Sequence, residues 1–193
     1  MSAAPAATAD AVPAKGGKKK LIIIIAAVLV LVLIGFFFGL KRDPSLLPSM
    51  MIGKAVPAFS LPPVRPEDRG FATTDLGGEP MLINYYASWC AACRIEHPLL
   101  MQLREQGVIL HGIDWKDKPE LGYKWIAERG DPYVRVGSDE SGRAGIDMGV
   151  SAVPETFVID KQGRVRYRHV GAVTREVWDT TLRPLMEKLR AES

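Results

Sequence analysis

The strongest fold signal in this chain is the segment Met81-Leu82-Ile83-Asn84-Tyr85-Tyr86-Ala87-Ser88-Trp89-Cys90-Ala91-Ala92-Cys93. Its first six residues form a short apolar and aromatic run, which is typical of a buried strand. Residues 91–106 then have apolar side chains at helical spacing, and Gly107 follows them. The sequence therefore predicts a strand that leads directly into a Cys-x-x-Cys pair at the start of a helix.

A Cys-x-x-Cys pair in this position suits thiol–disulfide chemistry. Unpaired N–H groups and the dipole at a helix N-terminus stabilise a thiolate, so we expect Cys90 to be the attacking thiol. Residues three apart share a helix face, so Cys93 can resolve the mixed disulfide. The chain has only these two cysteines. A structural disulfide closing so small a loop adds little stability, and a zinc site needs two further ligands. We therefore predict a redox pair that needs no metal or other cofactor.

Strands and helices alternate through the rest of the chain. We expect strands at residues 108–114, 133–136, 156–160 and 165–170, and helices at residues 119–129, 142–148 and from Thr174 to Leu189. This order predicts an α/β domain whose central sheet is covered by helices on both faces.

Residues 21–40, LIIIIAAVLVLVLIGFFFGL, contain no charge. Twenty residues at about 1.5 Å each span about 30 Å, the thickness of the hydrocarbon core of a bilayer, so we predict one transmembrane helix. A cleaved signal peptide has a shorter apolar run of about 7–15 residues and a small-residue cleavage site, which residues 41–44 do not provide. The pattern favours an uncleaved signal-anchor.

Basic residues flank the apolar segment. The net charge of the chain is +3; the four lysines and one aspartate of residues 1–20 supply +3, and Lys41 and Arg42 supply +2, which leaves −2 for the remainder. The pI near 8.9 is therefore no evidence for nucleic-acid binding. More positive charge precedes the segment than follows it, which favours a cytoplasmic N-terminus and an extracytoplasmic remainder. An oxidising periplasm also suits disulfide chemistry.

The chain thus divides into four predicted parts. They are a disordered cytoplasmic tail (1–20), an anchor in the cell inner membrane (21–40), a tether (41–52) and a periplasmic domain (53–193).

Several segments resemble a known family. Trp89-Cys90-Ala91-Ala92-Cys93 is similar to a thioredoxin-fold active site. The segments Cys93-Arg94-Ile95-Glu96-His97, Gly112-Ile113-Asp114-Trp115-Lys116-Asp117, Pro154-Glu155-Thr156-Phe157 and Arg166-Tyr167-Arg168-His169 resemble the CcmG/DsbE family of cytochrome c maturation thioredoxins, over about residues 47–190.

The resemblance implies a thioredoxin-like fold and a protein-disulfide reductase. The implied substrate is a disulfide of apocytochrome c, or of a haem lyase or other assembly chaperone. The implied electron donor is a membrane thiol transporter of the DsbD or CcdA type. One departure is the dipeptide Ala91-Ala92, where the family commonly has a proline.

The resemblance also implies a cis peptide bond before Pro154, opposite the cysteines. We expect Trp89, Val153 and Pro154 to contact the substrate. Asn84 stands six residues before Cys90, where thioredoxins carry a buried aspartate that assists proton transfer, and its amide cannot titrate. We predict that Glu155 accepts the proton of Cys93 instead, with Glu96 as a weaker candidate.

Two other functions remain open from the sequence. One is a broad-specificity periplasmic thiol–disulfide oxidoreductase. The other, of a different class, is an apocytochrome-binding module in which the cysteines do not turn over.

Overall fold

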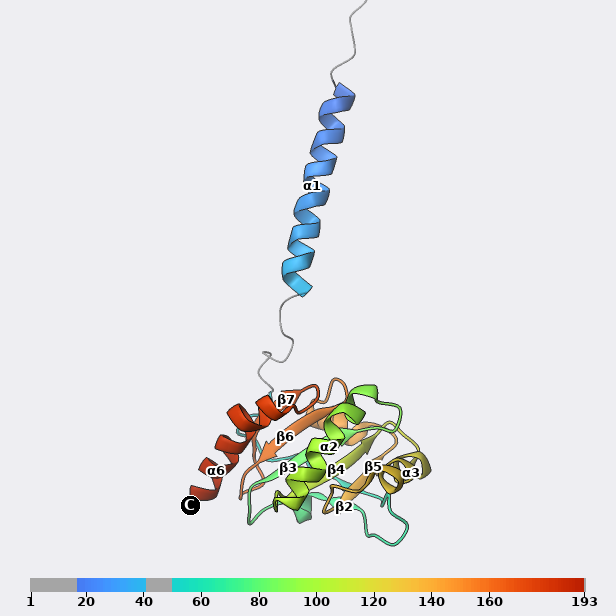
Figure 1. Ribbon diagram of the computed structural model, residues 1–193, viewed down its shortest axis with the longest axis vertical. Helices are drawn as coiled ribbons and strands as arrows, with labels where there is room; N and C mark the ends of the chain where they lie inside the picture. Colours follow the sequence, from blue (N-terminus) through green and yellow to red (C-terminus); the bar gives the residue numbers. More distant parts are fainter. Residues whose placement is uncertain (1–16, 41–49, 193) are drawn as a thin grey trace, which may run out of the picture. The chain divides into compact units, whose positions relative to one another are not determined.

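The computed structural model describes residues 17–40 and 50–192, which fall into two units, Met1–Asp43 and Pro44–Ser193. The predicted tail up to residue 16 and the tether at 41–49 lie outside the described residues. Helix α1 (Gly17–Leu40) forms the described part of the first unit (Figure 1). It begins four residues before the predicted start, because lysine is a good helix former and Lys18–Lys20 continue the helix.

Helix α1 has the properties of a membrane span. Its segment Lys20–Phe37 has a mean hydropathy of 3.1, and none of it is buried by the described residues. A helix that is apolar on every side needs an apolar environment on every side. The helix is therefore long and apolar enough to cross a bilayer, as the sequence predicted.

The second unit is built on a five-stranded mixed sheet with the order β5-β4-β3-β6-β7. Its strands are β3 (Met81–Tyr86), β4 (Leu110–Trp115), β5 (Val136–Asp139), β6 (Glu155–Ile159) and β7 (Val165–Val170). Strands β3, β4 and β5 run parallel, whereas β6 and β7 are antiparallel to their neighbours. The short strands β1 (Ser60–Leu61) and β2 (Phe71–Ala72) pair separately, and a 3-10 turn, η2 (Thr73–Asp75), follows them.

The predicted strand at 133–136 was wrong, because β5 begins only at Val136. Tyr133 is instead a buried core residue whose hydroxyl donates to Asn84 Oδ1 at 2.8 Å. A tyrosine buried on a helix-facing side needs such a partner, and the alternation pattern does not reveal it.

Helices cover both faces of the sheet (Figure 1). On one face, side chains of α2 (Ala91–Glu105), α3 (Pro119–Arg129) and the C-terminal helices pack with Leu82 and Tyr86 of β3. On the other, Ile83 and Tyr85 pack with residues that include Met148 of α4 (Arg143–Met148). Strand β3 is buried on both faces, as its continuous apolar run indicated.

The C-terminal helix has three parts: α5 (Arg175–Val177), a π-helical turn η3 (Trp178–Leu182) and α6 (Arg183–Ala191). Thr174 caps the start, since its Oγ1 accepts a hydrogen bond from the N–H of Val177 at 3.2 Å. Pro184 has no N–H to donate, which accounts for the irregular turn just before it.

Candidate functional site

The cysteine pair lies between the end of β3 and the first turn of α2. Cys90 is the N-cap residue of α2, and its Sγ accepts a hydrogen bond from the N–H of Cys93 at 3.0 Å. The two cysteines form a disulfide and are 4% and 1% exposed. Because this N–H and the dipole of the helix start act on the sulfur, a thiolate at Cys90 is stabilised once the disulfide is reduced.

Val153 and Pro154 lie at the same end of the sheet as the cysteines. Strand β6 begins at Glu155, which pairs with Tyr85 near the end of β3. The Val153–Pro154 peptide bond is cis, as the resemblance implied. Val153 is partly buried against the core. The contribution of both residues to substrate binding stays a prediction.

The loop that precedes Cys90 is held by the segment that follows β4. The N–H of Ser88 donates to Asp117 Oδ2 at 2.6 Å, and Trp89 Nε1 donates to the carbonyl oxygen of Lys116 at 3.2 Å. The Trp89 side chain is nonetheless 56% exposed. An exposed indole beside the disulfide offers a contact surface to a protein partner.

A buried carboxyl group lies about one helical turn after Cys93 in α2. Glu96 is 1% exposed, and its Oε1 accepts from Asn84 Nδ2 at 2.9 Å while its Oε2 accepts from the N–H of Val173 at 2.8 Å. Asn84 Nδ2 also donates to Thr156 Oγ1 at 3.0 Å. The network therefore joins β3, α2, β6 and the segment before α5.

Burial raises the pKa of Glu96 to about 7, although the hydrogen bonds from Val173 and Asn84 act in the opposite direction. Residues three apart on a helix have Cβ atoms about 5–6 Å apart, so Glu96 is a near neighbour of Cys93. A carboxyl group with a pKa near neutrality can accept and return a proton at working pH. The sequence ranked Glu96 second, because an acid early in a helix has a simpler explanation in the helix dipole.

Glu155 has contacts of another kind. It is fully buried, and its Oε1 accepts from the N–H and Oγ of Ser151 and the N–H of Ala152 at 2.7–3.1 Å. Arg168 donates to both of its carboxylate oxygens at 2.8 Å. These bonds connect Glu155 to the loop that leads into Pro154. Its predicted role as proton acceptor stays a prediction.

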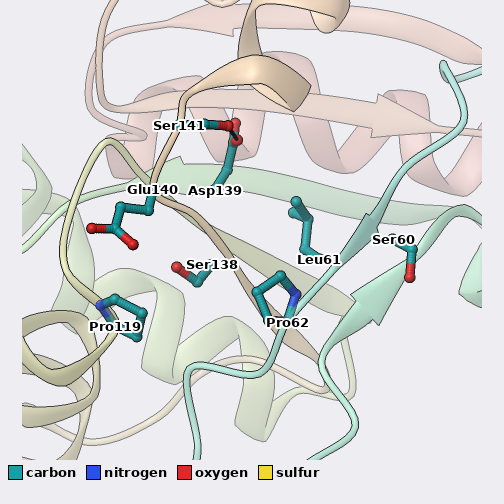
Figure 2. Close-up of a pocket in the computed structure, with 8 residues that line it drawn as sticks. All are labelled: Ser60, Leu61, Pro62, Pro119, Ser138, Asp139, Glu140 and Ser141. Atoms are coloured by element: carbon teal, nitrogen blue, oxygen red, sulfur yellow. Dashed lines mark hydrogen bonds between the residues drawn. The ribbon is translucent and has the colours of Figure 1, made fainter.

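A cavity of about 550 Å³ opens at the end of β5 (Figure 2). It is lined by Ser60–Pro62, by Pro119 at the start of α3 and by Ser138–Ser141. Neither cysteine lines it, so disulfide exchange takes place elsewhere. Among residues 17–40 and 50–192, no group of three or more histidine, cysteine, aspartate or glutamate side chains is arranged to hold a metal ion.

The chain is similar to known thiol–disulfide proteins. The redoxin family model matches residues 51–182. Thiol:disulfide interchange protein DsbE of Pseudomonas aeruginosa is 46% identical over 161 residues, which cover 83% of this chain and 89% of that protein. Thiol:disulfide interchange protein HelX of Rhodobacter capsulatus is 41% identical over 153 residues, 79% of this chain and 86% of that protein.

The structure of a DsbF homologue from Corynebacterium diphtheriae has the same fold. It superposes with a TM-score of 0.60 at 19% identity and covers 74% of this chain and 96% of that one.

Proposed function

Because this chain belongs to the redoxin family and, within it, to the CcmG/DsbE thiol:disulfide interchange proteins, we propose that it reduces disulfides of apocytochrome c, or of its assembly chaperone, during cytochrome c maturation. It is a thiol–disulfide oxidoreductase. Thioether attachment of haem to a Cys-x-x-Cys-His sequence needs free thiols, whereas an oxidising compartment closes such pairs into disulfides. The observation that carries the proposal is the Cys90–Cys93 disulfide at the start of α2.

The proposed reaction begins with the reduced pair. The Cys90 thiolate attacks one sulfur of the substrate disulfide, forms a mixed disulfide and releases the other sulfur as a thiolate. The Cys93 thiol loses its proton and attacks Cys90 Sγ, which releases the second substrate thiolate. Two electrons have then passed to the substrate, and Cys90 and Cys93 are joined as the structure has them.

The proton of Cys93 has a proposed acceptor in Glu96. Its raised pKa and its place one turn along α2 support this role. Both carboxylate oxygens of Glu155 accept hydrogen bonds, Oε1 from Arg168 and from Ser151 and Ala152, and Oε2 from Arg168. Those contacts support a part in shaping the Pro154 loop, and the variants described in the Discussion test its predicted catalytic part.

The proposed location is the inner membrane, with the N-terminus in the cytoplasm and the redox domain in the periplasm. Helix α1 supports an anchor, and the lysines before it support this orientation. A DsbD- or CcdA-type membrane thiol transporter is the proposed electron donor, which the anchor keeps in the same membrane. In spheroplasts, protease added from outside should digest the redox domain without lysis of the cells. The mass of the untreated protein should still include residues 1–40, because the anchor is not cleaved. Protection of the domain would contradict the orientation.

A trapping experiment tests the substrate. In the variant Cys93→Ala, Cys90 stays joined by a disulfide to the protein it attacked, which mass spectrometry then identifies. We expect apocytochromes c or their assembly chaperones. The matched control, Cys90→Ser with Cys93→Ala, should capture none of them. Capture of many unrelated exported proteins would instead identify a broad-specificity oxidoreductase.

Two measurements separate the remaining alternatives. A reduction potential near that of thioredoxin, about −270 mV, supports a reductant, whereas one near that of DsbA, about −120 mV, supports an oxidant. Full cytochrome maturation by the double variant Cys90→Ser, Cys93→Ser would indicate a binding module without redox turnover.

A further inference from the structure

Asp114 is a buried carboxyl group that the disulfide exchange described above does not use. It lies in β4, is 0% exposed, and neither of its carboxylate oxygens accepts a hydrogen bond from a donor among the described residues. An ionised carboxylate without partners is very costly to bury, so such groups are paired or neutral. In the sequence, Asp114 belongs to a segment that resembles the family, but the sequence assigned it no role.

The sheet neighbours of Asp114 do not compensate its charge. In register beside it are Tyr86 of β3 and Ser138 of β5, whose hydroxyl groups also have no partner among the described residues. Tyr133, which stacks on Tyr86 with ring centroids 5.1 Å apart, is neutral at working pH because burial raises its pKa well above the usual value.

Helix α3 closes the site from above the sheet. A Cβ at Gly122 would contact Asp114 Oδ2, so the helix backbone lies directly against the carboxyl group. The buried side chains of α3 are those of Trp125 and Ile126, and neither is charged. Three charged residues at the N-cap and within α3 are exposed: Lys118, Glu120 and Lys124. None of these elements supplies a buried cation.

Asp117 is the charged group that interacts with Asp114, both through its charge and through a side-chain hydrogen bond. Its Oδ2 accepts from the N–H of Ser88 at 2.6 Å and its Oδ1 from the N–H of Lys118 at 2.8 Å. Two ionised carboxylates have only acceptors and repel one another. A single proton between them converts this repulsion into a carboxylic acid–carboxylate hydrogen bond.

We propose that Asp114 is a positioning residue of the redox site, which keeps its proton and donates a hydrogen bond to the carboxylate of Asp117. That bond holds Asp117 where it accepts the N–H of Ser88, two residues before Cys90. Burial, and then the charge of Asp117, raise the pKa of Asp114 to about 8. Ionisation of Asp114 above that pH places two negative charges under the loop, which loosens it and raises the pKa of the Cys90 thiol.

Nuclear magnetic resonance of the reduced full-length protein in detergent micelles tests the proton directly. Between pH 6 and 10, we expect the ¹³C shift of the Asp114 carboxyl and the ¹⁵N shift of the Ser88 amide to change together, with a midpoint near 8. In Asp114→Asn the side chain still donates but cannot ionise, so this Ser88 step should be lost. The control Glu120→Gln removes an exposed acid of α3 and should keep it.

The same proteins give a readout at the thiol. The rate at which iodoacetamide alkylates Cys90 should follow two pH steps in the unaltered protein and in Glu120→Gln, and lose the upper step in Asp114→Asn. An Asp114 carboxyl already ionised at pH 6 would overturn the proposal, as would an upper step that survives in Asp114→Asn. If Asp114→Asn does not fold, the titration of the unaltered protein decides the question.

This inference rests on the proposed role of Cys90 as the attacking thiol. Its test is independent of the substrate, because neither the carboxyl titration nor the alkylation involves apocytochrome. Failure of the trapping experiment would therefore leave it standing, and its own failure would leave the substrate proposal intact.

Discussion

Asn84 Nδ2 lies 2.9 Å from Glu96 Oε1, and this buried hydrogen bond joins the strand before the cysteines to the helix that carries them. The amide at position 84 cannot exchange a proton at working pH, but it can hold a group that does. The proton acceptor that we propose for Cys93 thus lies on α2, where Glu96 shares a helix face with Cys93.

Replacing Glu96 by glutamine should slow the release of the mixed disulfide. Loss of a general base costs about 10²–10⁴-fold in rate, so we expect at least a hundredfold slower second step and accumulation of the mixed disulfide. In the unaltered protein this step should rise with pH around 7, the pKa of Glu96. Rapid acid quench and mass spectrometry measure both. Glu105→Gln, an exposed position at the end of α2, is the matched control and should behave normally.

The same variant should change how stability depends on pH. The pKa of Glu96 is raised from 4.5 to about 7, so the folded state holds the proton more tightly than the unfolded state. Its stabilising contribution is complete below pH 4.5 and is lost as pH rises through 7; it amounts to about 3 kcal/mol at most. Denaturant unfolding of the oxidised protein at pH 4–8 should therefore show a flatter profile for Glu96→Gln. An unchanged slope would contradict the assigned pKa.

The Arg168–Glu155 pair should be stabilising only as a pair. Arg168→Met leaves the fully buried Glu155 carboxylate without its cation, which we expect to cost about 3–5 kcal/mol of unfolding free energy. Adding Glu155→Gln should recover part of that loss, because the unpaired charge is gone. Chemical denaturation of the two single variants and the double variant measures the coupling.

Glu155→Gln also tests the catalytic part predicted for this residue. If Glu155 shapes the Pro154 loop, the pH step near 7 in mixed-disulfide release should persist in this variant. Loss of that step in Glu155→Gln, together with its survival in Glu96→Gln, would assign the proton to Glu155.

Trp89→Ala should weaken binding without weakening the fold. The indole is 56% exposed and has one hydrogen bond, to Lys116, so we expect a change of about 0.5 kcal/mol or less in unfolding free energy. As a partner contact, its loss should raise KM for a protein disulfide by about 5–30-fold, which corresponds to about 1–2 kcal/mol. The control is Ile146→Ala, which removes an exposed apolar side chain on α4. This variant should leave KM unchanged.

Local patterns were sufficient for most elements of the fold. The apolar run at Met81–Tyr86 forms strand β3. The apolar residues at helical spacing after Cys90 form helix α2, and those at Pro119–Arg129 form helix α3. Each of these follows from side-chain period and turn residues over a few positions. The prediction for residues 133–136 was wrong because Tyr133 is placed by its contact with Asn84, 49 positions earlier in the chain.

The Cys90–Cys93 pair could be identified from sequence because its spacing and its place at a helix start are local features. The acids around it could not be ranked in the same way. Glu96, Glu155 and Asp114 are all buried, yet one is hydrogen-bonded by neutral groups, one is paired with Arg168 and one faces Asp117. These differences arise from strands and helices far apart in the chain. Since the pKa of a carboxyl group depends on burial and on the charges that packing brings beside it, only the tertiary structure distinguishes the three.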